Sequence, residues 1–211
     1  DAEDGDLVEG MYKGMVNGLE DPYSVYYTAD EYVSLMESSN GIYYGIGVTV
    51  SQDITTGVIT LVKPFEGSPG LEAGILPGDV LYKVNDTEVI GMDLTKVVSM
   101  IKGEAGTTVN LTIVREGIEE PIQLTVERRQ IEVPTITHKM LANNIGYIQI
   151  LEFDEVTIEQ FNLAFKDLNN QGITGLIVDL RDNPGGILTV VNDILDKFLP
   201  EGLIVYTEDK Y

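Results

Sequence analysis

The spacing of the apolar residues changes character twice along this chain, near residue 40 and near residue 130. A period of 3.6 residues indicates an amphipathic helix, whereas strict alternation or a short continuous apolar run indicates a strand. The sequence therefore predicts a multidomain fold of mixed α+β and α/β class. Its parts are an N-terminal helical segment at 1–40, a β-rich domain at 41–129 and an incomplete α/β domain at 130–211.

The first segment is predicted to form two helices, the second of them short and over residues 29–37. The apolar residues of the first recur at helical spacing, and Asp21-Pro22 ends the run; they are Leu7, Val8, Met11, Met15 and Leu19. Gly10, Gly14 and Gly18 lie four residues apart, a spacing that favours close packing between helices. We therefore expect any homodimer to form through these N-terminal helices.

The second segment is predicted to contain several short strands and one main helix. The runs at 109–113 and 122–126 alternate cleanly, as half-buried antiparallel strands do. The helix starts after Asp93, a favourable N-cap residue, and stops at Gly103. Its apolar positions follow the i, i+3, i+4, i+7 pattern and are Leu94, Val97, Val98 and Ile101.

The third segment alternates strands with helices. A strand at 145–151 is followed by a helix that Thr157 and Gln160 open as a capping box. The apolar run at 175–180 is typical of a strand covered on both faces, so a βαβ unit is predicted. A last helix follows, and the residues predicted on its inner face are Leu188, Val191, Ile194, Leu195 and Phe198.

Two glycine-containing stretches of the second segment resemble bacterial PDZ domains. In residues 73–81, Gly74 supplies a positive φ, Pro77-Gly78 makes a tight turn, and Asp79 can bond nearby backbone amides. Residues 44–48 read Tyr-Gly-Ile-Gly-Val, and consecutive N–H groups beside glycines can form an anion nest. Alone, this loop is also compatible with a simple bend.

A third glycine motif, Asp-Leu-Arg-Asp-Asn-Pro-Gly-Gly at 179–186, lies where the predicted strand ends and the last helix begins. Backbone N–H groups at a helix start lack intrahelical partners, and the helix dipole favours negative charge there. Such a place suits an oxyanion hole, because glycines let a substrate approach the backbone without a Cβ in the way. Alone, the motif is also compatible with an ordinary helix start after a Pro-Gly turn.

In their order along the chain, these motifs resemble the carboxyl-terminal processing proteases, also called tail-specific proteases. The stretches at 17–24 and 128–134 extend the resemblance to essentially the whole chain. Members of this family are serine endopeptidases that use a Ser/Lys dyad, and their PDZ domain binds the C-terminal end of a protein substrate.

The resemblance assigns roles residue by residue. Gly45, Ile46, Gly47 and Val48 would receive the terminal carboxylate of a peptide that adds as an extra strand. Leu94, Val97, Val98 and Ile101 would divide between the peptide groove and the domain core. Gly185 and Gly186 match the family's oxyanion-hole position, with Gly186 slightly preferred.

The chain departs from the family pattern after the diglycine. The family's nucleophile lies in a Ser-Ala-rich stretch beyond that motif, and no such stretch precedes Tyr211. We therefore expect a trimmed or processed chain that carries half an active site and is inactive alone. A non-catalytic PDZ adaptor and a pseudoprotease are the alternative interpretations.

Composition excludes several other functions. With 35 acidic against 13 basic residues the formal net charge is -22, which disfavours nucleic-acid partners. The chain has no cysteine and a single histidine, His138, so a Cys/His zinc site is excluded, and no metal or other cofactor is expected. No apolar run is long enough to span a membrane. The family resemblance implies an extracytoplasmic location in a bacterium.

Overall fold

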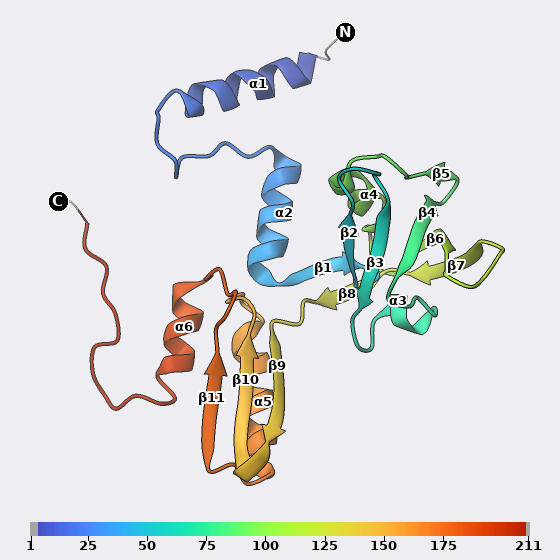
Figure 1. Ribbon diagram of the computed structural model, residues 1–211. Coiled ribbons are helices and arrows are strands. Elements are labelled where there is room, and N and C mark those ends of the chain that lie inside the picture. Colours follow the sequence, from blue (N-terminus) through green and yellow to red (C-terminus); the bar gives the residue numbers. More distant parts are fainter. Residues whose placement is uncertain (1–3, 210–211) are drawn as a thin grey trace. The chain divides into compact units, whose positions relative to one another are not determined.

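The protein divides into two compact units, residues 1–40 and 41–211, in a computed structural model that describes residues 4–209 (Figure 1). The first unit contains α1 (Asp4–Asn17) and α2 (Ala29–Asn40), joined by an ion pair of 2.7 Å between Lys13 Nζ and Glu31 Oε1. Both predicted helices are confirmed, although residues 1–3 lie outside the described part. Their apolar side chains stay in solvent: Leu7, Met11 and Met15 are 58%, 60% and 73% exposed.

A six-stranded antiparallel sheet forms the centre of the β-rich part of the second unit. Its main path runs in the order β2-β3-β4-β6-β7, and β5 pairs with β4. The strands are β2 (Val48–Gln52), β3 (Ile59–Pro64), β4 (Asp79–Val84), β5 (Thr87–Glu88), β6 (Thr108–Val114) and β7 (Ile122–Glu127). Two helices accompany them, α3 (Pro69–Glu72) and α4 (Leu94–Ile101). The strands predicted at 109–113 and 122–126 are present as β6 and β7.

The local signals that shape this part act as predicted. The Asp93 side chain accepts from the Lys96 amide at 3.2 Å and caps α4. Gly74 and Gly78 have φ of +91° and +92°, which side chains with a Cβ rarely adopt. Asp79 accepts from the Leu76 amide at 2.8 Å and also binds the Arg115 guanidinium, a partner that the sequence does not indicate.

A short two-stranded ribbon joins the beginning and the end of the β-rich part. It pairs β1 (Ile42–Gly45) with β8 (Arg129–Glu132) in antiparallel register, with Gly45 opposite Arg129. The first strand leads directly into the predicted carboxylate loop, and the second leads out toward the α/β part. The sequence does not predict this pairing.

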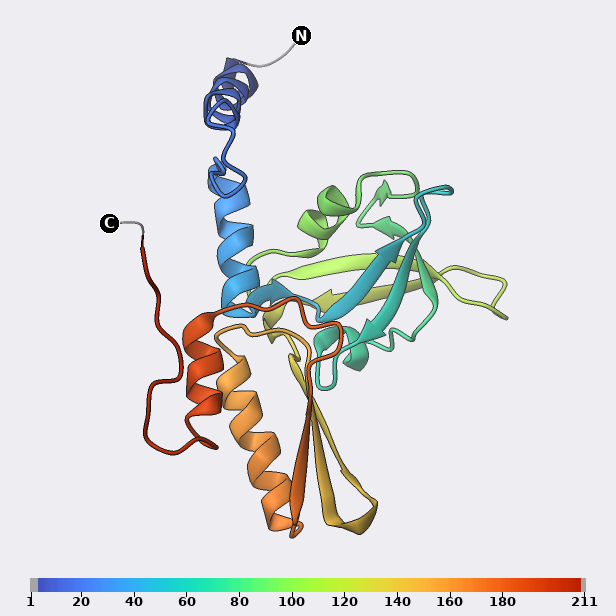
Figure 2. The same cartoon turned by 60° about the vertical axis from the view of Figure 1, so that its left-hand side comes forward.

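The α/β part is a three-stranded sheet with two helices on one face (Figure 2). Its order is β11-β10-β9, with β10 and β11 parallel and β9 antiparallel to β10. The parallel pair separated by α5 confirms the βαβ unit. The elements are β9 (Ile136–Leu141), the 3₁₀ turn η1 (Ala142–Asn144), β10 (Ile145–Ile150), α5 (Thr157–Asn170), β11 (Gly175–Asp179) and α6 (Leu188–Leu195).

The apolar core of this part lies between the sheet and the helices. Ile148 and Ile150 of β10 pack with Phe161 and Leu168 of α5 and with Ile194 of α6. The cover predicted on both faces of β11 is not present within the described residues. The strand lies at a sheet edge with helices on one face only, and Ile177 and Val178 are 47% and 41% exposed.

The predicted capping box is also wrong, because tertiary partners replace the local ones. The Thr157 hydroxyl accepts from the Asp154 amide at 2.9 Å and donates to the Thr135 hydroxyl at 2.8 Å. The Gln160 amide group bridges to the main chain before β9, accepting from Thr135 N–H and donating to Val133 O, each at 2.9 Å. Gln160 therefore ties α5 to the connection that follows β8.

The inner face of α6 differs in part from the prediction. Val190 and Ile194 are the buried residues of this helix, whereas Leu188 and Leu195 are 47% and 37% exposed. Phe198, beyond the helix, makes edge contacts with Phe161 and Phe165. Within residues 4–209, no helix has the length and apolar character needed to cross a bilayer.

Candidate functional site

A small apolar pocket lies between the edge strand β2 and helix α4. Its volume is about 100 Å³. Residues of β1, of β2, of the loop between them and of the C-terminal half of α4 line the pocket. They are Tyr43, Gly45, Ile46, Val48, Val50, Val98, Ile101 and Lys102. Because β2 ends the strand order of its sheet, one side of its backbone is open to a further strand.

The loop between β1 and β2 turns its carbonyls inward. Ile46 O accepts from the Gly70 amide and Gly47 O from the Phe65 amide, each at 2.8 Å. In a trans peptide the following N–H points opposite to the carbonyl, so the N–H groups of Gly47 and Val48 point away from these partners. Two successive amides are thus directed to the open side of the loop, as an anion nest requires.

Gly47 is required by both conformation and space. Its φ is +68°, and a Cβ there would lie 2.5 Å from Ser68 Cβ. Gly47 itself is not among the lining residues of the pocket, and its contribution to the site is its backbone.

The structure brings five of the eight predicted peptide-binding residues to the pocket: Gly45, Ile46, Val48, Val98 and Ile101. Val97 is fully buried in the domain core, and Leu94 packs against that core. Val98 and Ile101 line the pocket, and Ile101 also belongs to the buried core. Sequence reasoning missed Tyr43, Val50 and Lys102, of which only Val50 carried a usable signal, its alternation with Val48.

Two positively charged side chains lie at the C-terminal end of α4, beside this pocket. Arg128, 9% exposed, donates from Nε to Ile101 O at 2.7 Å and from Nη2 to Met100 O at 3.0 Å. These carbonyls have no partner within the helix, so Arg128 satisfies them. Lys102 follows the helix, and its Nζ lies 4.9 Å from the centroid of the Tyr43 ring.

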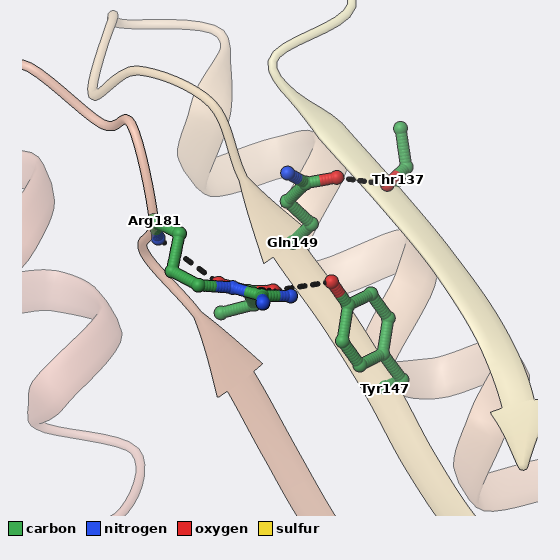
Figure 3. A network of polar contacts seen from close by, with 5 residues as sticks. Thr137, Tyr147, Gln149 and Arg181 are labelled. Carbon is green, nitrogen blue, oxygen red and sulfur yellow. Dashed lines mark hydrogen bonds and ion pairs between the residues drawn. The ribbon is translucent and has the colours of Figure 1, made fainter.

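The predicted catalytic motif begins at the end of β11 with a carboxylate network on the sheet face opposite the helices (Figure 3). Asp179 accepts from Tyr147 Oη at 2.5 Å and from Arg181 Nη2 at 2.5 Å. It also accepts from the Arg181 amide at 2.9 Å, so it holds the backbone as the chain leaves the strand. The Arg181 guanidinium, the Tyr147 hydroxyl and that amide hold the pKa of Asp179 well below its usual range. The Arg181 side chain is 82% exposed.

Asn183 then shapes the turn that presents the two glycines. Its Nδ2 donates to Ile150 O at 2.9 Å, and its Oδ1 accepts from the Gly185 amide at 2.7 Å. The Gly185 N–H, one of the two oxyanion-hole candidates, is therefore engaged within the protein.

Gly186 makes a parallel bridge with Phe153. The ladder bonds run from Phe153 N to Gly185 O at 3.0 Å and from Ile187 N to Phe153 O at 2.7 Å. Because its neighbours make both bonds, the N–H of Gly186 points to the other side of the strand. Gly186 is also exposed. A Cβ at this residue would lie 2.3 Å from Phe153 O, so the close approach requires glycine.

One buried carboxyl lies next to this turn. Asp154 follows Phe153 directly and is 5% exposed. Burial, and to a lesser degree the charge of Glu152, raise the pKa of Asp154 to about 6. A carboxyl with this pKa changes its charge near neutral pH.

Three serines, Ser24, Ser68 and Ser99, have structural roles. Ser68 caps α3, the Ser24 hydroxyl donates to Asp21 Oδ2 at 2.6 Å, and the Ser99 hydroxyl donates to Lys96 O at 2.7 Å. His138 Nε2 lies 3.0 Å from Asp167 Oδ2, and both side chains are partly exposed. Among residues 4–209, no three acidic or histidine side chains gather as a metal site would require.

Comparison with known proteins matches two sequence families. Residues 144–211 match peptidase family S41, and residues 59–115 match the PDZ domain. Carboxy-terminal processing proteases CtpA and CtpB of Bacillus subtilis (strain 168) are 38% and 35% identical over 95% and 92% of this chain. The chain spans 42% and 40% of the length of these two relatives.

A solved structure shares the fold. The photosystem II D1 C-terminal processing protease superposes with a TM-score of 0.54 at 23% identity, over 88% of this chain and 52% of that protein. The mixed fold class expected from the sequence is thereby confirmed.

Proposed function

Because this chain belongs to the carboxy-terminal processing serine proteases of peptidase family S41, we propose that it provides their tail-recognition module and the first half of an active site. The whole enzyme would be a serine-type endopeptidase that binds substrates by their C-terminal ends. Its Ser/Lys dyad would come from sequence outside residues 1–211.

One observation carries the proposal: an apolar pocket opens beside an edge strand, next to a loop with two outward backbone amides. Val98 and Ile101 of α4 supply the wall opposite β2. A peptide would pair with β2, place its last side chain in the pocket and its carboxylate at the amides of Gly47 and Val48.

The diglycine turn supports the catalytic half of the proposal. A tetrahedral intermediate needs preorganised donors directed at its oxyanion. The Gly186 N–H points away from its strand partner, whereas the Gly185 N–H is already bound to Asn183. Gly186 is therefore our first candidate for the donor, and Gly185 becomes a supporting residue of the turn.

Fluorescence anisotropy of labelled decapeptides with the full chain tests the binding half. Peptides with a free apolar C-terminus should bind, and their C-terminal amides should bind more weakly because the amide lacks the charge that the nest attracts. Equal binding of acid and amide would contradict tail recognition.

Sequencing the coding region beyond the Tyr211 codon tests the catalytic half. A Ser-Ala-rich motif followed by a lysine supports the protease, and its loss identifies a pseudoprotease. A purely non-catalytic adaptor remains the alternative if no such region follows. The chain by itself should not turn over an unfolded protein substrate, and turnover by a highly purified sample would refute this expectation.

We also propose that the N-terminal helices mediate a homodimer. Leu7, Met11 and Met15 are exposed, and a Cβ at Gly10 or Gly14 would meet no atom within 4 Å. Burial of such side chains favours association. Sedimentation should show a dimer that Met11→Glu converts to a monomer, while an exposed Glu20→Gln control remains dimeric.

The family supports an extracytoplasmic location in a bacterium for the parent protein. Fractionation of cells that express the native gene, followed by detection with an antibody, tests this proposal. Recovery in the cytoplasmic fraction would contradict it.

A further inference from the structure

We propose that Asp154 is a positioning residue for the diglycine turn, and that it holds this turn in place only while its carboxyl group is protonated. The residue lies in the connection between β10 and α5, residues 151–156, which also contains Phe153. The effect on the turn depends on the fold of this chain alone. Its consequence for catalysis rests on the proposed function.

Asp154 acts on the turn through the main chain of Phe153. Phe153 N–H donates to Gly185 O at 3.0 Å, and Phe153 O accepts from Ile187 N–H at 2.7 Å. These two bonds lie on either side of Gly186 in the chain. Because the peptide bond between Phe153 and Asp154 is rigid and planar, a displacement of Asp154 also displaces the Phe153 carbonyl. The geometry of the turn therefore depends on where Asp154 is held.

The Asp154 carboxyl group is buried without a hydrogen-bond donor. Asp154 is 5% exposed, and its own N–H donates to the Thr157 hydroxyl at 2.9 Å. Among the described residues, no side chain or amide donates to its carboxyl oxygens. An ionised carboxylate that is removed from water without a partner is strongly unfavourable. The packed position of Asp154 therefore suits the neutral acid.

Gly41, at the entry to β1, closes the other side of this carboxyl group. A Cβ placed on Gly41 would lie 3.3 Å from Asp154 Oδ2 and 2.5 Å from Val156 Cγ2. The space that cannot take a methyl group cannot take a water molecule either. Gly41 is itself held, because Gly41 O accepts from Val133 N–H at 2.8 Å. Water on this side can therefore reach the carboxylate only if the connection moves away from Gly41.

The charges on the surrounding segments do not compensate for this burial. Glu152 is the residue whose charge acts on the Asp154 carboxyl group, and together with burial it raises the pKa of Asp154 to about 6. The Arg181 guanidinium is engaged by Asp179. The charged residues on the connection itself, at the end of β8, in the first turn of α5 and before the diglycine are Glu152, Glu155, Glu132, Glu159, Arg181 and Asp182.

Protonation of Asp154 is therefore linked to the order of the diglycine turn. A group whose pKa is raised in the packed state stabilises that state while it is protonated, and this contribution is lost as pH rises through the raised pKa. Above that pH, conformations in which the connection leaves Gly41 and the carboxylate gains water become more populated. The bonds of Phe153 to Gly185 and Ile187 open with them. In the proposed enzyme, the Gly186 donor would thus be best ordered under mildly acidic conditions.

Amide hydrogen exchange of the full chain, followed by NMR, tests the inference at the Ile187 N–H. With a pKa of about 6 in the packed state and about 4 in the open state, the protection factor of this amide should fall about tenfold from pH 5 to pH 7.5. The protection factor is corrected for the intrinsic effect of pH on exchange. Because the opening is local, low concentrations of urea should leave the protection of Ile187 unchanged.

Asp154→Asn replaces the carboxyl group with a neutral group of the same shape. In this variant the protection of Ile187 should stay the same at both pH values, near the value of wild type at pH 5. Glu155→Gln is the matched control, because it makes the same chemical change at the exposed next residue. It should retain the tenfold change of wild type. The dispersion of the amide signals verifies that each variant remains folded.

Three outcomes would overturn the positioning role of Asp154. The first is a protection factor of Ile187 that does not change with pH in wild type, and the second is a change that persists in Asp154→Asn. The third is protection that falls steeply with urea, because Ile187 would then exchange only through global unfolding. The peptide-binding measurement tests the proposed function separately, so either result can fail while the other stands.

Discussion

Arg128 Nε donates to the main-chain oxygen of Ile101 at 2.7 Å, which ties the residue before β8 to the last residue of α4. The same guanidinium reaches Thr108 O from Nη1 at 2.9 Å. One buried side chain therefore joins the helix, the strand β6 and the exit of the β-rich part. Loss of the Arg128 side chain should therefore destabilise the helix, the strand and the exit segment at the same time.

Replacing Arg128 should destabilise the β-rich part strongly, whereas replacing its neighbour should not. Arg128→Met leaves the buried carbonyl of Ile101 and the part-buried carbonyl of Thr108 without their donor, which should lower the free energy of unfolding by about 3 kcal/mol. Arg129→Met removes an exposed ion pair with Glu72 and should cause only a small loss. Urea unfolding monitored by circular dichroism gives both values. Similar losses for the two variants would contradict this assignment.

The two glycines of the candidate oxyanion turn should differ sharply in their tolerance of a methyl group. Gly186→Ala places a Cβ 2.3 Å from Phe153 O, so the bridge to Phe153 must open, at a cost of about 3 kcal/mol or more. In Gly185→Ala the new Cβ meets no atom within 4 Å, so the only cost in free energy comes from the φ of +113°, about 1–2 kcal/mol. Urea unfolding of the two variants compares these costs directly. A larger loss in Gly185→Ala would show that the turn has another geometry.

The pKa of Asp179 should depend mainly on Arg181. Because the folded-state pKa is depressed, the carboxylate stabilises the fold above its unfolded value of about 4, and this contribution is lost as pH falls. Arg181→Met should raise the Asp179 pKa toward its ordinary value, and Tyr147→Phe should raise it less. Carboxyl carbon chemical shifts followed by NMR from pH 7 to pH 2 measure both. An unchanged midpoint in Arg181→Met would refute the network's role.

The effect of Asp154 on stability should depend on pH in the opposite direction from that of Asp179. Its folded-state pKa of about 6 lies above the unfolded value, so the stability linked to its proton is present below about pH 4 and lost as pH rises through 6. Asp154→Asn should equal wild type near pH 4 and exceed it at pH 7.5, by up to about 2 kcal/mol. Glu152→Gln, which removes the secondary cause, should give a smaller gain. Urea unfolding across this pH range tests both variants, and a pH-independent difference would contradict the burial argument.

Features that depend on a few neighbouring residues could be predicted from the sequence. The Asp93 cap, the positive φ of Gly74 and the extent of α4 all follow from residues within one turn of each other. The βαβ unit follows from the change in apolar period between β10 and β11. The fold class was predictable because these local signals agree with one another.

Features that join distant segments could not be predicted. The pairing of Ile42–Gly45 with Arg129–Glu132 has no local signal, and without it Tyr43 has no reason to face the pocket. Thr157 and Gln160 have the spacing of a capping box, but buried partners before β9 take their side chains instead. The exposure of β11 depends on which faces the helices cover, and an apolar run does not specify that.

The candidate site likewise contains features that the sequence indicates and features that it does not. Gly47 and Gly186, which the backbone requires, could be singled out because their motifs resemble those of the family. The cations at the end of α4 could not, because Lys102 and Arg128 meet at this point only after residues far apart in sequence have paired. The functional roles of the predicted peptide-binding and oxyanion-hole residues remain predictions for the experiments above.

The β1–β8 ribbon brings the two ends of the β-rich segment, the proposed peptide-binding module, to one place. Since Gly45 and Arg129 face each other across the ribbon, everything between them leaves and returns at one place. A tight turn joining these two residues would convert the ribbon into a hairpin and excise the whole segment. Under the proposed function, grafting the corresponding segment of another relative between the same two residues would exchange the tail preference while the rest of the chain keeps its sequence.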